Sequence, residues 1–194
     1  MLFNPRMEAP AAAQKPALAP TSVILAGFML IAGTIVLLWF APASYQIYLA
    51  LHVVAIVIWV GGDVTLTTLG IVFERRRDGE TLAALGKMGA WIGTRIYTPA
   101  LFAAFALGVA LVEKGHWGWS TFWIDFAIAA WGITAAVGVG FVGPELGRID
   151  RAAQTFGPDS AEVAHRVKRL FTVFRFDTAI LILAVIDMTA KPSF

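Results

Sequence analysis

Four ionisable side chains stand inside long apolar runs of this sequence, and they are the first candidates for chemistry: His52, Asp63, Asp125 and Asp177. An ionisable group inside a bilayer is unfavourable by several kcal/mol unless it faces other helices and finds a partner there. An imidazole at such a place can bind a metal, hold a haem iron or relay protons. The alternative for His52 is an ordinary hydrogen bond to a neighbouring helix.

The residues around His52 follow a helical period. His52, Ile56, Trp59 and Asp63 are spaced i, i+4, i+7 and i+11, which places them on one face of a helix. We expect that face to point into a helical bundle. At ~1.5 Å of rise per residue, His52 and Asp63 are separated by ~16 Å, so they serve opposite halves of the membrane.

Each half has its own candidate partners. On the side of His52, the second candidate metal ligand is His116, which stands beside Gly115 in a short loop where a solvated histidine is the alternative. On the other side, Asp63, Asp177 and Arg95 fall within about two turns of the membrane surface. Opposite charges at one depth usually pair, so we predict structural ion pairs among these three, with a proton path as the alternative.

The composition indicates a membrane protein. Hydrophobic residues make up 58% of the 194 residues and charged residues only 14%, whereas soluble domains have roughly 45–50% and about 25%. The chain has no cysteine, which excludes disulfides, iron–sulfur clusters and cysteine nucleophiles. A net charge of +2 gives no reason to expect nucleic acid, so the expected partner is the lipid bilayer.

The predicted fold class is an all-α transmembrane bundle with five spans. Residues 1–20 are proline-rich and predict a flexible tail, and residues 21–194 form the membrane domain. Gly143-Pro144 is predicted to stop the fourth span, and Asp159-Ser160 to start the last helix. Each of five stretches is long enough to cross a bilayer: about 21–40, 45–73, 92–112, 122–142 and 170–189.

The first stretch has an alternative reading as a secretory signal. Arg6 and Lys15 precede it, and Ala41-Pro42-Ala43 resembles a cleavage site. Signal cores usually have about 7–15 apolar residues, and this stretch is longer. Its length favours an uncleaved helix.

The distribution of basic residues predicts the orientation. With the N-terminus inside, 13 of the 15 Lys and Arg residues lie on the inner side, and only Lys114 and Lys191 lie outside. Trp117, Trp119 and Trp123 then gather at the outer surface, as membrane anchors do. The predicted location is a bacterial inner membrane with a cytoplasmic N-terminus.

A row of small residues predicts a packing face in the fourth span. Gly132, Ala136 and Gly140 are spaced by four, which lets another helix approach closely, either in this chain or in another membrane subunit. No phosphate-binding loop or dinucleotide-binding turn is present, so the motifs give no direct support for an enzyme.

From His52 onward the sequence resembles an uncharacterised family of small bacterial integral membrane proteins, a four-helix domain of unknown function related to the CopD copper-resistance domain and to HemJ-type proteins. The resemblance rests on Leu51-His52-Val53-Val54, Trp59-Val60-Gly61-Gly62, Thr98-Pro99 and the ending Met188-Thr189-Ala190-Lys191-Pro192. It covers about three quarters of the chain, and the first span would be an N-terminal addition.

The resemblance implies haem b as a cofactor held by His52, because a histidine of this kind is implicated in haem binding in HemJ-type proteins. Their second functional residue, an intramembrane lysine, has no counterpart in the third to fifth spans. Three functions therefore stay open. The first is a membrane subunit of unknown role, for example an accessory subunit of a larger complex. The second is a b-type haem protein, and the third is a copper or small-solute transport protein.

Overall fold

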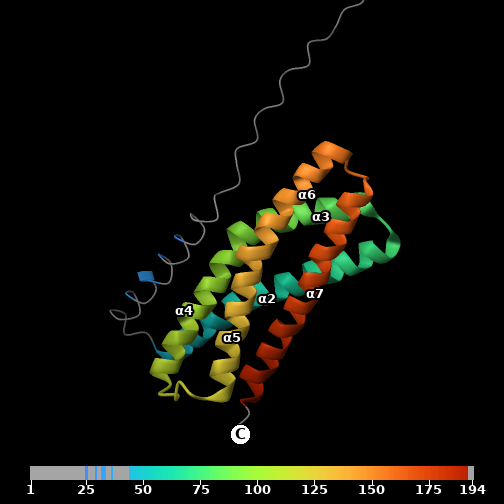
Figure 1. Cartoon of the computed structure of the whole chain (residues 1–194). Coiled ribbons are helices and arrows are strands. Elements are labelled where there is room, and N and C mark those ends of the chain that lie inside the picture. Colours follow the sequence, from blue (N-terminus) through green and yellow to red (C-terminus); the bar gives the residue numbers. More distant parts are fainter. Residues whose placement is uncertain (1–24, 26–28, 30–31, 34–35, 37–43, 192–194) are drawn as a thin grey trace, which may run out of the picture.

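In the computed structural model, residues 25, 29, 32–33, 36 and 44–191 are described, and within these ranges the chain is all-α. Four long helices run alternately up and down (Figure 1). The first is α2 and the last is α7, while π-helical turns join α3 to α4 and α5 to α6. Their bounds are α2 Tyr45–Arg76, α3 Gly79–Ile92, η1 Gly93–Tyr97, α4 Thr98–Lys114, α5 Phe122–Val137, η2 Gly138–Val142, α6 Gly143–Phe156 and α7 Ala161–Ala190.

Three of these helices are long and apolar enough to cross a membrane, judged by length and composition: Tyr45–Arg76, Gly79–Lys114 and Phe122–Phe156. The predicted fifth span, 170–189, lies within α7, which is not among the three. The predicted tail, 1–20, and most of the predicted first span, 21–40, lie outside the described residues. The all-α class and the multi-pass character are therefore confirmed, and the five-span count stays a prediction.

The helix ends follow from local sequence. The carboxylate of Asp78 accepts from the backbone N–H of Thr81 at 3.0 Å and caps α3. The hydroxyl of Ser160 accepts from the N–H of Val163 at 3.4 Å and caps α7, so the predicted helix start at Asp159-Ser160 is confirmed. Arg77 ends α2 in the left-handed conformation, with φ 56°.

Proline does not end the fourth span, contrary to the prediction for Gly143-Pro144. The helix continues from α5 into α6 through the π-helical turn η2, which directly precedes this pair. The same arrangement occurs at η1, which directly precedes Thr98-Pro99, and there the Thr98 hydroxyl donates to the Gly93 carbonyl at 2.8 Å. A proline ring removes one N–H and crowds the preceding turn, and a wider turn accommodates both effects.

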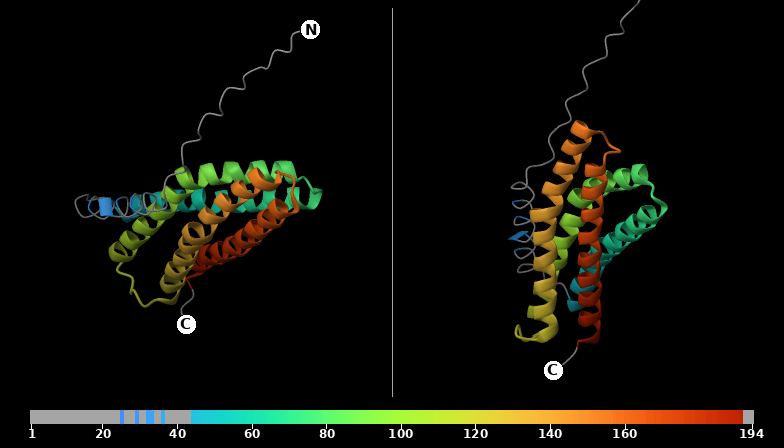
Figure 2. Two further views of the ribbon diagram at one scale, coloured as in Figure 1. Left: turned by 45° about the horizontal axis from the view of Figure 1, so that its top comes forward. Right: turned by 45° about the vertical axis from the view of Figure 1, so that its right-hand side comes forward.

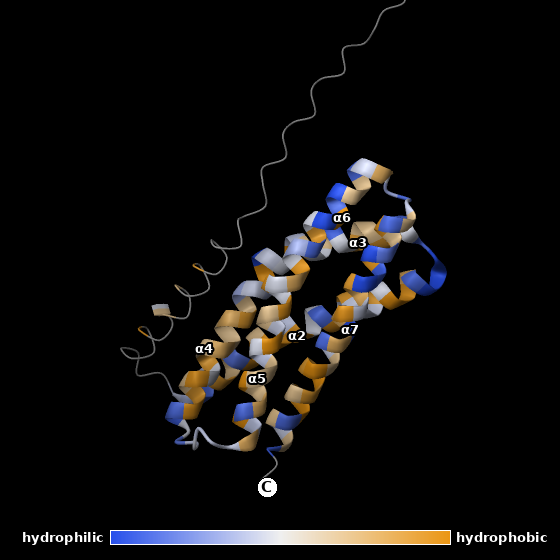
Figure 3. Ribbon diagram, viewed as in Figure 1, coloured by the Kyte–Doolittle hydropathy of each residue, from blue (hydrophilic) through white to orange (hydrophobic). Residues whose placement is uncertain are grey.

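The helices pack into two regions (Figure 2). Along most of the bundle, α2 packs against α4 and α7, and α5 packs against α7. At one end α3, α6 and the first half of α7 form what we call the amphipathic end, whose core contains Leu82, Val163 and Phe171. The loop 115–121 and the end of α7 form the opposite end, which we call the tryptophan end. Figure 3 shows polar residues concentrated on α6, on the link between α2 and α3 and on the first half of α7, and apolar residues along α4, α5 and the second half of α7.

Candidate functional site

His52 lies inside the bundle, as its helical stripe predicts. Its side chain is only 7% exposed. The Nδ1–H donates to the Ala104 carbonyl oxygen on α4 at 2.8 Å, because a carbonyl can only accept. This bond places the proton on Nδ1 and leaves the lone pair of Nε2 free. Nε2 is buried and has no hydrogen-bond partner among the described residues.

Gly108 makes room for the imidazole ring. A Cβ atom at this position would lie 3.3 Å from His52 Cε1, which is tighter than ordinary van der Waals contact. The absence of a side chain therefore lets the edge of the ring approach α4 and reach the Ala104 carbonyl. Sequence reasoning did not identify either residue of α4.

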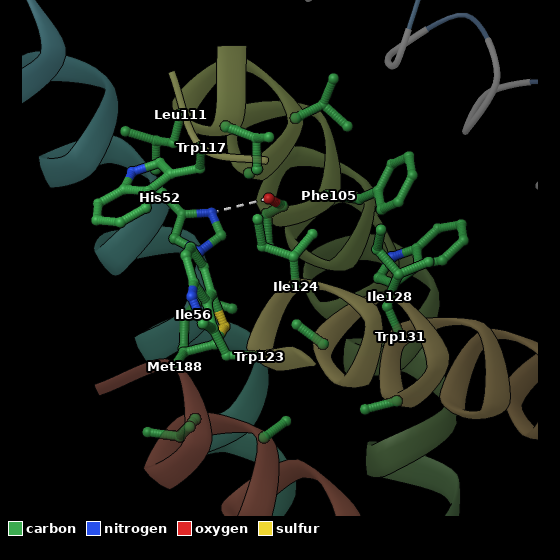
Figure 4. Close-up of a pocket in the computed structure, with 18 of the residues that line it drawn as sticks. His52, Ile56, Phe105, Leu111, Trp117, Trp123, Ile124, Ile128, Trp131 and Met188 are labelled. Carbon is green, nitrogen blue, oxygen red and sulfur yellow. Dashed lines mark hydrogen bonds between the residues drawn. The ribbon is translucent and has the colours of Figure 1, made fainter. Parts of the chain in front are cut away.

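A cavity of about 170 Å³ adjoins His52. Its walls come from α2, α4, α5, α7 and the loop 115–121, and they are mostly aromatic and aliphatic. Figure 4 shows one ring nitrogen of His52 turned toward the Ala104 carbonyl and the other toward the side of the cavity where Trp123 and Met188 lie. Phe105 stacks on Trp131 with ring centroids 4.1 Å apart at another wall.

The cavity is bounded at the tryptophan end by a lysine held between indoles. The Lys191 ammonium lies 4.6 Å from the Trp117 ring centroid and 5.3 Å from that of Trp123. The two indoles meet edge to face, with centroids 5.5 Å apart. All three residues line the cavity, where the two indoles hold the Lys191 ammonium by cation–π contact, and the anchoring role of the tryptophans stays a prediction.

The other predicted ligands on this side do not reach the cavity. His116 is exposed in its loop with φ 54°, and Asp125 is exposed in the first turn of α5. Neither residue lines the cavity. Among the described residues, no group of three or more His, Cys, Asp or Glu side chains gathers where a metal ion could bind. The described residues therefore give no support to a metal site built from His52 and His116, which stays a prediction.

The two intramembrane aspartates belong to a hydroxyl network. The Thr178 hydroxyl donates to the Asp63 carboxylate and lies 2.8 Å from the Thr67 hydroxyl. The Thr134 hydroxyl donates to Asp177 at 2.8 Å. These bonds link α2 to α7 and α5 to α7, one turn beyond the cavity residues Trp59, Ala130 and Leu181.

The predicted ion pairs with Arg95 are not present. Neither Asp63 nor Asp177 has a cationic partner within the described residues. The Arg95 guanidinium lies instead over the Trp91 ring, 4.8 Å from its centroid, on the preceding turn of the same helix. Arg175 on α7 instead forms an ion pair with Glu74 on α2.

The small-residue row points away from the described helices. A Cβ added to Gly132 or Gly140 would meet no described atom within 4 Å, and Ala136 is exposed. No described helix of this chain fills that face, and packing against another subunit stays a prediction. Close approach occurs instead on α2, where a Cβ at Gly70 would lie 2.3 Å from the Phe171 ring.

Glu145, the one fully buried carboxylate among the described residues, was not predicted. Glu145 is 0% exposed and accepts from Arg148 at 2.9 Å and from Arg166 at 3.2 Å. The second arginine comes from α7, so only tertiary packing brings the pair together. The available sequence signal was an acidic residue directly after Pro144, in the first turn of a helix.

Comparison with known proteins adds no assignment: no protein-family model, curated protein or solved structure matches the chain. The apolar length of the helices therefore decides the class. The chain is a multi-pass helical membrane protein. Within this class, the cavity beside His52 is the part of the described structure that best fits a ligand, because a buried polar atom opens onto an apolar enclosure.

Proposed function

We propose that this membrane protein binds a small, largely apolar guest in the cavity beside His52. The observation that carries the proposal is the Nε2 atom of His52, which is buried without a partner at the wall of the cavity. A buried polar atom left unsatisfied is unfavourable by about 1–3 kcal/mol. A guest that satisfies Nε2 recovers that free energy.

The cavity volume sets the size of the guest. An apolar cavity of about 150 Å³ stays dry inside a protein and binds benzene. The cavity here is about 170 Å³ and has similar lining, so its volume matches a guest of one ring. The fold leaves this volume open because Ala104, Gly108 and Ala184 present little or no side chain to it.

Guest binding is testable with 4-fluorotoluene and 4-fluorophenol as ¹⁹F NMR probes on the full chain in nanodiscs. We expect saturable binding of at least one probe, corrected for partitioning into empty nanodiscs. Ala184→Phe fills the cavity and should abolish the binding. Ala129→Phe adds the same ring at an exposed position of α5 and should leave it intact. Absence of saturable binding for both probes contradicts the proposal.

A haem protein is the second candidate, and the protonation of His52 favours it. A histidine that donates Nδ1–H to a carbonyl and keeps Nε2 free has the form of an axial iron ligand. Met188 lines the same cavity, and a thioether is a known second axial ligand. The volume of this cavity does not fit a haem, since pockets for drug-sized molecules, which are smaller than haem, already measure about 300–1,000 Å³.

An absorption spectrum separates the two candidates. A b-type haem in the purified protein gives a Soret band, and His52→Ala should remove it. A colourless protein that still binds the fluorinated rings supports the small guest. A Soret band retained in His52→Ala contradicts His52 as the haem ligand, and a purified protein without a Soret band contradicts the haem candidate.

We also propose that the protein resides in a bacterial inner membrane with its N-terminus in the cytoplasm. The placement of 13 of 15 basic residues on one side supports this orientation. In the described residues, the arginines of α6 and of the first half of α7 lie at the amphipathic end, which would then face the cytoplasm. A reporter fused after Phe194 should be active only outside the cytoplasm, and cytoplasmic activity contradicts the proposal.

A further inference from the structure

We infer that the guest is a single aromatic ring bearing a phenolic hydroxyl, which donates its hydrogen bond to His52 Nε2. This inference rests on the proposed function and names its ligand class. It follows from three features of the cavity: the hydrogen-bonding role of Nε2, the aromatic walls and the charge of the lining residues.

The first feature is the direction of the hydrogen bond. Because Nδ1 donates to the Ala104 carbonyl, the neutral ring offers only a lone pair at Nε2. A guest must therefore bring a donor or a Lewis acid to satisfy this atom. A hydroxyl group is a donor small enough for the volume, whereas a metal ion would find no group of three or more His, Cys, Asp or Glu ligands among the described residues.

The second feature is the shape of the walls. Five of the seven tryptophans line the cavity, and Phe105 stacked on Trp131 presents a further flat surface. Aromatic faces stack well on another aromatic ring. An aliphatic alcohol would satisfy Nε2 equally but would gain less from these walls.

The third feature is charge. Of the described residues that line the cavity, none is Asp, Glu, Asn, Gln, Ser or Thr, and Lys191 contributes an ammonium. A cationic guest would be repelled and would find no anion. A phenol is neutral, its oxygen carries partial negative charge, and its ring carries no positive group, so it matches this lining.

The experiment compares 4-fluorophenol with 4-fluorotoluene, which differ by a hydroxyl in place of a methyl group. Binding to the full chain in nanodiscs is followed by ¹⁹F NMR, and affinities are referred to each probe's concentration in the bilayer. We expect the phenol to bind about five- to tenfold more tightly, as one hydrogen bond in a buried site predicts. Equal binding of the two probes overturns the inference while the proposed function stands. Failure of both probes to bind overturns the proposed function itself.

Two controls assign the preference to His52. His52→Phe keeps a ring but removes the acceptor, so both probes should bind within about twofold of each other. His116→Phe changes an exposed histidine at the same end and should leave the preference unchanged. Should His52→Phe fail to fold, 4-fluoroanisole replaces the variant, because its methylated oxygen cannot donate. A preference that persists in His52→Phe or for the anisole overturns the inference.

The source of such a ring is either a soluble phenol or the head group of a membrane lipid, and displacement of bound 4-fluorophenol separates them. Phenol represents the soluble source, and 4-decylphenol carries an alkyl tail that keeps it in the bilayer. Displacement by phenol alone indicates entry from water, and displacement by 4-decylphenol as well indicates room for a lipid tail. Displacement by neither compound overturns the inference.

Discussion

His52 and Glu145 are both buried polar side chains, but their polar atoms are satisfied to different degrees. At the amphipathic end each carboxylate oxygen of Glu145 accepts from an arginine, and one of these arginines joins α6 to α7. Beside the cavity, His52 uses one nitrogen to join α2 to α4 and leaves the other without a partner. A fully satisfied buried group serves packing, and a partly satisfied one adjoining a cavity is available to a ligand.

The Asp63 and Asp177 network lies between these two cases. Its two carboxylates accept from threonine hydroxyls of α7 and α5, without a cation among the described residues. Hydroxyl donors satisfy oxygen atoms but supply no charge. The three sites therefore differ in how completely their charges are neutralised and their polar atoms hydrogen-bonded. Glu145 is the most complete, the two aspartates are intermediate and His52 is the least complete. Substitutions at and around these sites test that order.

The largest effect is expected for Glu145→Gln. The amide cannot accept from both arginines as a carboxylate does, so we expect the free energy of unfolding to fall by about 3 kcal/mol. Glu162→Gln is the matched control, because Glu162 pairs with the same Arg166 at 2.7 Å but is 44% exposed. It should lose less than about 1 kcal/mol. Unfolding by SDS measures both values, and equal losses would contradict the structural role assigned to Glu145.

The next largest effect is expected at Gly70, which lies in a more tightly packed region than Gly108 beside the cavity. Gly70→Ala places a methyl group 2.3 Å from the ring of Phe171, which is only 3% exposed and has no room to move. We expect a loss of about 1–3 kcal/mol. Gly108→Ala meets His52 at 3.3 Å, where the adjoining cavity lets the ring shift, so we expect less than about 1 kcal/mol.

Gly61→Ala is the control for both glycine variants, because a Cβ there meets no described atom within 4 Å. It isolates the change in helix propensity, which favours alanine. A Gly108→Ala loss as large as that of Gly70→Ala would mean that the cavity gives no freedom to His52.

A smaller effect is expected for Arg95→Gln. An exposed cation–π contact contributes about 0.5–1 kcal/mol, and we expect a loss within that range. Arg175→Gln removes the contact that joins α7 to Glu74 on α2 and should lose more. A loss of several kcal/mol in Arg95→Gln would show that this arginine does neutralise the aspartate network, which would restore the ion pairs predicted from sequence.

Sequence periodicity and capping residues predicted those features of the fold that depend on one helix alone. The stripe from His52 to Asp63 predicted that His52 faces inward, and the cap at Ser160 predicted the start of α7. Arg95 was placed by depth alone, and depth does not determine in which direction a long side chain extends. Its own helix offers Trp91 one turn away, which is a nearer partner than a carboxylate on another helix.

The remaining features depend on contacts between helices, for which one sequence gives little signal. Gly108 and the Ala104 carbonyl matter only because α4 packs against α2 at the level of His52. Arg166 reaches Glu145 across 21 positions of sequence. Gly143-Pro144 predicted a helix end, because the rule for an isolated helix does not include a π-helical turn that accommodates the missing N–H.

The smallest effect concerns Asp78, a carboxylate outside the membrane-spanning helices whose bonds are local. It accepts from the Thr81 hydroxyl at 2.7 Å and from the Thr81 N–H at 3.0 Å. The side-chain bond to Thr81 is the main reason that the pKa of Asp78 lies below its ordinary value of 3.8, and the backbone bond and Arg76 act in the same direction.

Because the folded pKa is the lower one, the stabilisation is complete above the unfolded value and is lost as the pH falls through the folded value. ¹³C NMR of the Asp78 carboxyl should show this lowered pKa, and Thr81→Val should raise it toward 3.8. A pKa unchanged in Thr81→Val would mean that the hydroxyl bond to Asp78 is not formed, and the backbone bond alone would then cap α3.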